Sequence, residues 1–315
     1  MSPSRKPTDP LYTKEMLYQI EASLATGDDR TVDLMNVGGE IVQEELEECD
    51  TTPRDMEGWG LVSDQYIVGF LNEQYGGFRE TEDFVSIWAP TNLYFEPNKT
   101  EQETQELFTT VLKEYEASEE AAALTDLIKS QLKDTAVNKV MGFGLGSPGF
   151  TQPALFEIWL KVKDKSNFAL SNFVDYAAAL VVARAVAEMN GSDVVPPVLV
   201  QDPAYTPVCK QVLTASGFEI IECFAGKGFT LVDENTIVLS HNPDFPFRGI
   251  IADLARPAAI CMRHQHGPDE SNDTADPDNP RSKKMLEMYR EVTLPFEEQR
   301  AFYHNVWYIR EPKKE

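Results

Sequence analysis

The chain has 315 residues, 42% of them hydrophobic and 10% aromatic, which is enough apolar material for a sizeable core and excludes wholesale disorder. Its 28 basic and 52 acidic residues give a formal net charge of −24 at pH 7. An acidic surface repels nucleic-acid phosphates and anionic lipid headgroups, so neither nucleic acid nor a membrane is an expected partner.

Features of the whole chain indicate where the protein works. The first residues include basic side chains but no apolar run after them, so a secretory signal is not expected. The most apolar stretch, residues 177–187, contains Arg184 and is too short to span a bilayer. The four cysteines lie far apart without a C-x-x-C pair, which indicates free thiols in a reducing compartment. The expected location is the cytoplasm, with the nucleus as an alternative.

Residues 1–135 are expected to form a mixed, mainly helical N-terminal region. A helix is predicted after Thr13, a suitable N-cap that precedes apolar residues at helical spacing. Residues 83–97 indicate one or two short strands. Two amphipathic helices follow, and the first of them opens with a capping-box pattern at Thr100 and Glu103.

Strands and helices alternate from residue 136 to residue 315. The expected strands are 138–145, 197–203, 218–223, 235–241, 257–263 and 305–310. Short apolar strands separated by helices are typical of a parallel sheet covered on both faces. We therefore expect an α/β fold with a Rossmann-like, mostly parallel, doubly wound sheet in this domain and the N-terminal region as an extension.

Helices are predicted between these strands. The longest should begin at Ser171 or Asn172, which can act as its N-cap, and end at Gly191. Another should begin at Thr206, which is followed by a proline suited to the first turn. Further helices are predicted over 246–255 and near 283–292.

Two polar segments invite a metal hypothesis. Residues 264–281 form a predicted flexible loop that contains His264, His266 and Asp269, and residues 40–50 are rich in carboxylates. Solvated side chains explain both patterns better, because no histidine interrupts the acidic run and the histidines lie in a strongly polar loop. No metal site is expected.

A glycine turn follows the first strand of the predicted sheet. In open parallel sheets, ligands bind outside the carboxyl ends of the strands, where the strand order reverses. Gly142, Gly144, Gly146 and Ser147 lie at such an end, and glycine lets a backbone approach a ligand closely. Because Ser147 stands where the dinucleotide fingerprint needs its third glycine, the spacing fits the looser G-x-G-x-G pattern of adenosylmethionine-binding sheets better.

Two other strand ends carry candidate ligand-binding residues. Asp202 and Pro203 follow the second strand, where the carboxylate could grip ribose hydroxyls or cap the next helix. His241, Asn242 and Pro243 follow the fourth strand, and the histidine could act as an acid, a base or a ligand, or could make a structural hydrogen bond. Neither a nucleophile elbow nor a P-loop pattern occurs in the sequence.

With these elements in order, the chain resembles the sensitivity-to-red-light-reduced family, and its fungal members in particular. The stretches that carry the resemblance, between residue 138 and about residue 263, are KVMGFGLGS, FVDYAAALVVARAV, PVLVQDPAYTPVCKQVLTASGFEII and TIVLSHNPDFPFRGIIADL. The resemblance implies a Rossmann-like domain and a regulatory role, which in plants includes light signalling and circadian timing. By position, the family's glycine turn corresponds to Gly142, Gly144 and Gly146, its acidic turn to Asp202 and Pro203, and its histidine to His241.

The chain departs from the family pattern at two places. Ser240-His241-Asn242 stands where the family often has Pro-His-Cys, so haem ligation by a cysteine is not expected, although a vertebrate relative is linked to haem metabolism. Residues 150–170 form an insertion.

Two functions from different classes follow. We expect a regulatory protein whose Rossmann-like domain serves as a scaffold or senses a small nucleotide-like ligand. The alternative is a methyltransferase-like enzyme that uses S-adenosylmethionine on a small molecule or a protein, with His241 as its catalytic residue. The sequence identifies no cofactor beyond this candidate.

Overall fold

The computed structural model describes a continuous core and several shorter stretches of the chain. The described residues are 10, 12–25, 31–35, 41–45, 59–60, 67–69, 86–88, 94–95, 100–148, 165–202, 205–222, 226–241, 243, 245–264, 276, 278–296 and 299–312. The predicted loop residues His266 and Asp269 lie outside these ranges.

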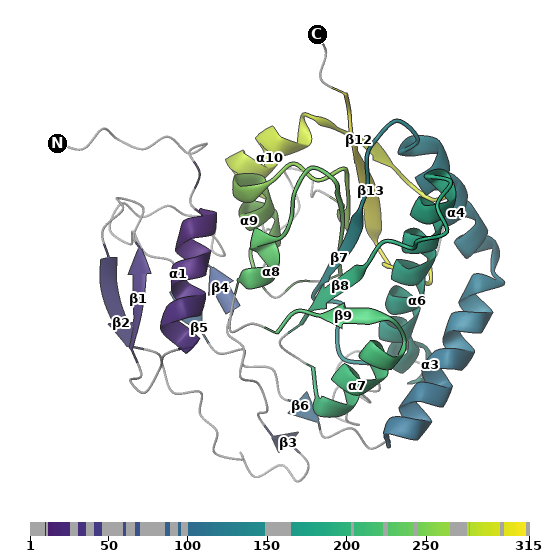
Figure 1. Cartoon of the computed structure of the whole chain (residues 1–315), viewed down its shortest axis with the longest axis horizontal. Helices are drawn as coiled ribbons and strands as arrows, with labels where there is room; N and C mark the ends of the chain where they lie inside the picture. Colours follow the sequence, from purple (N-terminus) through teal and green to yellow (C-terminus); the bar gives the residue numbers. More distant parts are fainter. Residues whose placement is uncertain are drawn as a thin grey trace.

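A seven-stranded mixed sheet forms the centre of the molecule (Figure 1). Its strands, in spatial order, are β12 (Tyr289–Val292), β13 (Asn305–Arg310), β11 (Ala259–Arg263), β10 (Thr236–Ser240), β7 (Lys139–Phe143), β8 (Val198–Gln201) and β9 (Phe218–Ile220). The five strands from β11 to β9 run parallel, whereas β13 is antiparallel to both of its neighbours. The α/β class is confirmed, and the strand order reverses at β7, which has β8 on one side and β10 on the other.

Alternate residues of the central strands enter two separate hydrophobic clusters, because successive side chains of a strand point to opposite faces. Val140 and Ile237 belong to one cluster, whereas the next residues, Met141 and Val238, belong to the other. Both faces of the sheet are therefore buried, which explains why these strands are continuous apolar runs.

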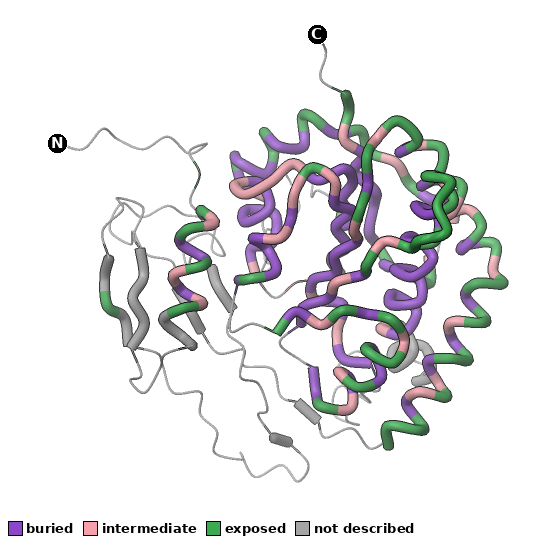
Figure 2. Tube along the Cα trace, viewed as in Figure 1, coloured by how far each residue is buried: buried purple, intermediate pink, exposed green. Residues whose placement is uncertain are grey.

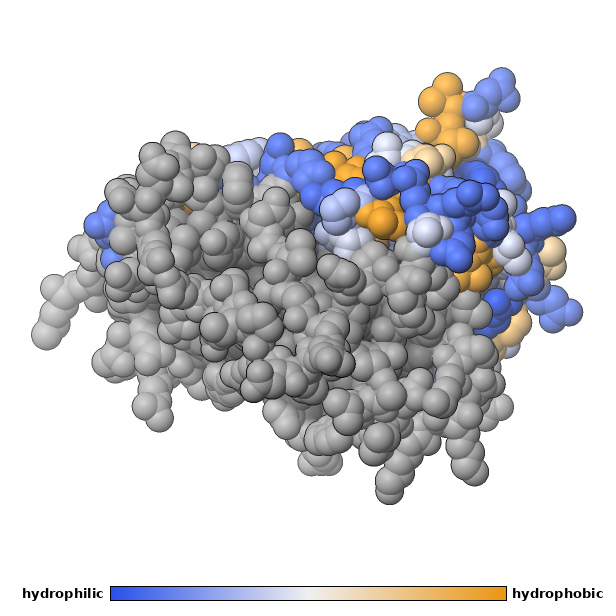
Figure 3. All heavy atoms as spheres, turned by 90° about the horizontal axis from the view of Figure 1, so that it is seen from below, coloured by the Kyte–Doolittle hydropathy of each residue, from blue (hydrophilic) through white to orange (hydrophobic). Residues whose placement is uncertain are grey.

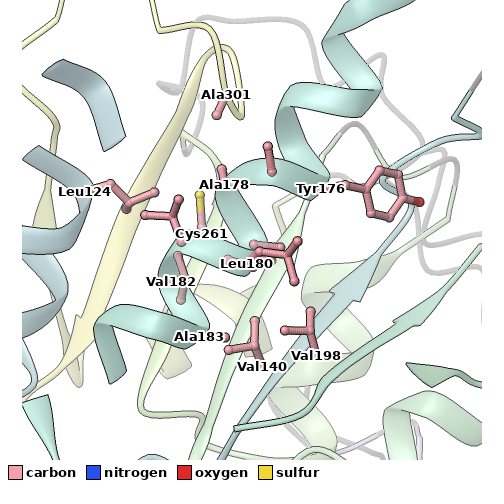
Figure 4. Close-up of a cluster of buried hydrophobic side chains, with 14 of the residues drawn as sticks. Leu124, Val140, Tyr176, Ala178, Leu180, Val182, Ala183, Val198, Cys261 and Ala301 are labelled. Carbon is pink, nitrogen blue, oxygen red and sulfur yellow. The ribbon is translucent and has the colours of Figure 1, made fainter. Parts of the chain in front are cut away.

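Four helices cover the first face of the sheet. They are α3 (Glu101–Glu116), α4 (Glu119–Gln131), α6 (Lys165–Met189) and α7 (Pro207–Ala215). The helix α6 lies between the sheet and α3 and α4, so nearly every described side chain from 173 to 187 is buried (Figure 2). Figure 4 shows Ala178 and Val182 of this helix close to Val140 and Cys261 of the strands.

The other face is covered by helices from both ends of the chain. They are α1 (Lys14–Ala25), α8 (Lys227–Thr230), α9 (Phe247–Leu254) and α10 (Pro280–Leu286). The helix α1 forms hydrogen bonds with both ends of α8. Lys14 Nζ donates to the carbonyl of Thr230 at 2.8 Å, and the Glu21 carboxylate accepts the N–H groups of Gly226 and Lys227. The N-terminal helix is thus part of the packed core.

Short antiparallel pairs account for the other described strands. These are β1 (Thr31–Met35) with β2 (Ile41–Glu45), β3 (Trp59–Gly60) with β6 (Tyr94–Phe95), and β4 (Ile67–Gly69) with β5 (Ser86–Trp88). Two of these strands, β5 and β6, lie within the predicted strand region 83–97. The domain boundary at residue 135 stays a prediction, and α3 and α4 on its N-terminal side share the hydrophobic cluster of the sheet.

Local capping signals were predicted well. Glu103 N–H donates to the Thr100 side chain at 3.2 Å and Thr100 N–H donates to the Glu103 carboxylate at 2.8 Å, which completes the predicted capping box of α3. Thr206 accepts the N–H of Cys209 and caps α7 as predicted. These predictions are confirmed because a cap depends on residues within one helical turn.

Two predicted helix boundaries are wrong. The helix α6 begins at Lys165, so Ser171 and Asn172 lie inside it, and the Asn172 side chain donates to the carbonyl of Ser147 instead of capping. The helix predicted near 283–292 ends at Leu286, and Tyr289–Val292 pairs with β13 as β12. Pairing with a neighbouring strand outweighs the helical preference of this segment.

Among the described residues that Figure 3 shows, hydrophilic ones predominate and hydrophobic ones occur in small separate groups. Within the described ranges, every helix is too short or too polar to cross a bilayer.

Candidate functional site

The loops that follow β7, β8 and β10 meet at one edge of the sheet. A Cβ atom placed on Gly144 would lie 3.8 Å from the carbonyl oxygen of His241 and 3.6 Å from Cα of Pro243. The N–H of Gly146 donates to the Asp202 carboxylate at 2.7 Å. The turn after β7 therefore contacts both the acidic turn and the histidine loop. Pro203 and Asn242, which were also predicted for this site, lie outside the described residues.

The glycine turn needs its glycines for packing and for backbone conformation. Gly144 and Gly146 have φ values of +62° and +81°, in the left-handed region that favours glycine. A Cβ atom on Gly142 would lie 2.6 Å from Leu145, and one on Gly146 would lie 2.6 Å from the Asn172 amide. Two of the three glycines thus make room for protein side chains.

Two N–H groups of this turn already have partners within the protein. Gly144 N–H donates to the Gln201 carbonyl at 3.3 Å, and Gly146 N–H donates to Asp202. A phosphate cradle uses such backbone N–H groups as donors. In this conformation, these two groups hold the turn to the end of β8 rather than offer a phosphate site.

Asp202 is 4% exposed and braces the glycine turn. The predicted alternative that it caps the next helix is not what the structure shows, because Thr206 caps α7. Ribose binding stays a prediction, and it would require a ligand to reach a carboxylate that Gly146 already engages.

A buried polar cluster lies beneath the glycine turn. The Tyr176 hydroxyl lies 2.7 Å from the carbonyl of Gly146, to which it can donate, and 2.8 Å from the Tyr205 hydroxyl. Ser147 Oγ lies 2.7 Å from Cys209 Sγ, so this serine faces the interior. Burial raises the pKa of both tyrosines well above the ordinary value, and the hydroxyls therefore act as neutral hydrogen-bonding groups.

His241 forms a buried pair with a residue that the sequence analysis did not single out. Its Nδ1 lies 2.5 Å from Oδ2 of Asp175, which comes from α6 and is 0% exposed. Burial opposes the charged imidazole, but the charge of Asp175 and its hydrogen bond outweigh burial and raise the pKa of His241, with Arg263 acting in the opposite direction. The available signal was one carboxylate in an otherwise apolar helical run, FVDYAAALVV.

The second oxygen of Asp175 holds the turn that leads into β13. Phe302 N–H donates to Oδ1 of Asp175 at 2.6 Å, and the buried Glu120 accepts the N–H groups of Arg300 and Ala301 at 2.9 Å each. Two buried carboxylates therefore bind three successive backbone N–H groups. The residues of this turn include Phe302 and His304, whose φ values of +50° and +65° are strained for side chains of this size.

No metal site emerges from the described residues, among which no three His, Cys, Asp or Glu side chains cluster. His264 instead pairs with Glu291, with Nε2 and Oε1 separated by 3.2 Å, and both side chains are exposed. Cys209 and Cys261 are buried free thiols.

Together, the sheet and its edge define an α/β protein in which a glycine turn, a buried acid and a paired histidine gather where the strand order reverses. The SRR1 domain, named for sensitivity to red light reduced, matches residues 108–246, from α3 to the residue before α9. This match supports the family that the sequence resemblance indicated. No curated protein matches the chain.

Proposed function

We propose that this chain is an SRR1-type regulatory protein whose α/β domain is Rossmann-like and senses a small nucleotide-like ligand. The ligand would bind at the edge formed by the loops after β7, β8 and β10. Light signalling and circadian timing, which the family resemblance implies, are the kind of process such a protein would regulate.

The observation that carries this proposal is the meeting of three loops at the point where the strand order reverses. The parallel strands follow the order β9-β8-β7-β10-β11, which matches the first five strands of the dinucleotide-binding sheets. Gly144 lies against the backbone of His241 and Pro243, so a ligand at this edge could contact two strand ends at once. The SRR1 match supports the regulatory part of the proposal.

A second candidate is an adenosylmethionine-dependent, methyltransferase-like enzyme. The spacing of Gly142, Gly144 and Gly146 at the end of β7 favours it, because this spacing fits the G-x-G-x-G pattern of adenosylmethionine-binding sheets. The engagement of the Asp202 carboxylate by Gly146 bears equally on both candidates, since either ligand would place its ribose there. Ligand sensing is the preferred function because the SRR1 match supports a regulatory protein.

Melting temperatures recorded with S-adenosylmethionine, S-adenosylhomocysteine, nicotinamide dinucleotides and haemin test the proposal. A ligand at 100 times its dissociation constant adds about 2.7 kcal/mol, which is a shift of several degrees for a domain of this size. We expect a shift with at least one nucleotide and none with haemin. A larger shift with S-adenosylmethionine than with the dinucleotides would support the second candidate.

The location of binding is tested by amide chemical shifts in the labelled protein. Binding at the proposed edge should move the resonances of Gly144, Gly146 and His241, while those of α10, which packs against α9 and β12 on one face of the sheet, stay in place. The absence of any melting shift, or shifts confined to α10, would refute the proposed ligand site.

A further inference from the structure

We propose that His241 is an anion-binding residue whose imidazolium, held by Asp175, donates from Nε2 to a phosphate or carboxylate group of the ligand. This inference rests on the proposed function, because it names the group by which the same edge would recognise its ligand. It assigns Asp175 as a positioning residue that acts through His241.

The geometry leaves one side of the imidazole for a ligand. Nδ1 is committed to Oδ2 of Asp175 at 2.5 Å, and Nε2 lies on the other side of the ring. The His241 side chain keeps 14% of its surface exposed, so part of the ring reaches the solvent. Among the residues that the structure describes, none forms a hydrogen bond or an ion pair with Nε2.

The charges around His241 favour the protonated ring. Asp175 on α6 lies in direct contact and stabilises the imidazolium, whereas Arg263 on β11 opposes it more weakly. A charged N–H donor forms a shorter and stronger hydrogen bond to an anion than a neutral donor does. The contact with Asp175 therefore orients the ring and favours its cationic form at an edge of a strongly acidic protein.

The glycine turn does not supply an alternative anion site. Its N–H groups at Gly144 and Gly146 are already donated to Gln201 and Asp202. Gly144 lies next to the backbone of His241, so the histidine belongs to the same edge of the sheet as the glycine turn.

The turn that contacts Asp175 has an unfavourable backbone conformation. The turn that donates Phe302 N–H to Asp175 keeps Phe302 and His304 at positive φ. Strained residues of this kind persist only where the surrounding structure holds them, and they gather at functional sites. This strained turn binds the carboxylate that also contacts His241. Strain at this place agrees with a binding role for the histidine.

Matched pairs of ligands test the inference. Adenosine monophosphate is compared with adenosine, which lacks the phosphate, and S-adenosylhomocysteine is compared with its methyl ester, in which the carboxylate carries no charge. Calorimetry gives the dissociation constants, and the ring resonances of His241 are followed as inorganic phosphate is added. The variants are His241→Gln, Asp175→Asn, which keeps the shape but removes the charge, and the exposed control His264→Gln.

We expect at least one ligand to bind wild type about ten-fold more tightly than its counterpart without the anionic group, as one charge-assisted hydrogen bond provides. This advantage should vanish in His241→Gln, fall in Asp175→Asn and persist in His264→Gln. Should His241→Gln fail to fold, the Asp175→Asn result and the ring resonances decide.

The remaining outcomes separate the two proposals. Binding of adenosine with no advantage for the monophosphate, and no response of His241 to phosphate, would overturn the anion site but leave the ligand site standing. A response of His241 to inorganic phosphate without any nucleotide binding would support the anion site and refute the nucleotide-like ligand. If no ligand binds and the His241 ring resonances do not respond to phosphate, both the ligand site and the anion site are overturned.

Discussion

The Asp202 carboxylate and the Gly146 N–H are joined by a hydrogen bond of 2.7 Å that ties together the ends of two neighbouring parallel strands. Together with the bond from Gly144 N–H to the Gln201 carbonyl, it holds the turn after β7 to the end of β8. Because Gly144 in the same turn lies against the His241 loop, this bond helps to position all three parts of the candidate site.

Removing the Asp202 carboxylate should destabilise the protein. Asp202→Ala leaves the Gly146 N–H without its charged acceptor in a buried place, which costs about 2 kcal/mol. Urea unfolding measures the change in free energy. Asp193→Ala, in an exposed loop, is the control and should change stability little. Equal losses in the two variants would contradict the bracing role.

A methyl group at Gly146 should cost more than one at Gly191. Both residues have positive φ, so alanine brings a backbone penalty of about 1 kcal/mol at either site. Only Gly146 has a neighbour in the way, the Asn172 amide, whereas nothing lies within 4 Å of a Cβ on Gly191. We expect Gly146→Ala to lower the free energy of unfolding by about 1–3 kcal/mol more than Gly191→Ala does, as measured by urea unfolding.

The same comparison in an Asn172→Ala background checks the cause. In that background, the difference in unfolding free energy between Gly146→Ala and Gly191→Ala should become smaller, because the obstructing amide has been removed. An unchanged difference would show that the extra cost has another origin.

The pair of His241 and Asp175 should make stability depend on pH. The pKa of His241 is raised in the folded protein, so the stabilisation is fully present below the unfolded pKa of 6.5 and is lost as pH rises through the folded pKa. Each unit by which folding raises the pKa of His241 corresponds to about 1.4 kcal/mol of stabilisation of the folded protein. His241→Gln should therefore destabilise the protein more at about pH 5.5 than at about pH 9.

Urea unfolding of wild type and variant at both pH values measures this difference, and subtraction removes the titration of other groups. His264→Gln, whose side chain is exposed, should show little pH-dependent change. A larger loss at high pH would show that the sign is wrong and that Asp175 does not favour the imidazolium.

The docking of α1 should depend on one apolar side chain. Leu17 is 0% exposed and packs against Gly226, so Leu17→Ala should cost about 3 kcal/mol. Its neighbour Tyr18 is 53% exposed, and Tyr18→Ala should have little effect. Hydrogen exchange of α1 and α8 provides the measurement. Exchange in α1 that is equal in both variants would refute the docking role of Leu17.

Features that depend on neighbouring residues in the chain were predictable. The capping box at Thr100 and the cap at Thr206 are local hydrogen bonds, and the five parallel strands are short apolar runs between helices. The gathering of candidate residues at strand ends followed from the same pattern. The family resemblance was also readable, because it rests on linear motifs.

Features that depend on partners distant in the chain were missed. Residues 289–292 look helical alone but form a strand because β13 offers its edge. Asn172 was predicted as a cap, yet its side chain reaches the glycine turn. The role of Asp175 was not predicted, although its carboxylate contacts the His241 ring and accepts the N–H of Phe302.

By itself, then, the sequence determined the α/β class, the helix caps at Thr100 and Thr206, the family resemblance and the three strand ends where polar residues occur. The tertiary structure alone decided what each polar residue does: Asp202 braces a glycine turn, and Asp175 orients His241. The physical reason is that a hydrogen bond between residues 56 or 66 positions apart depends on how the sheet and α6 pack, which no local pattern encodes.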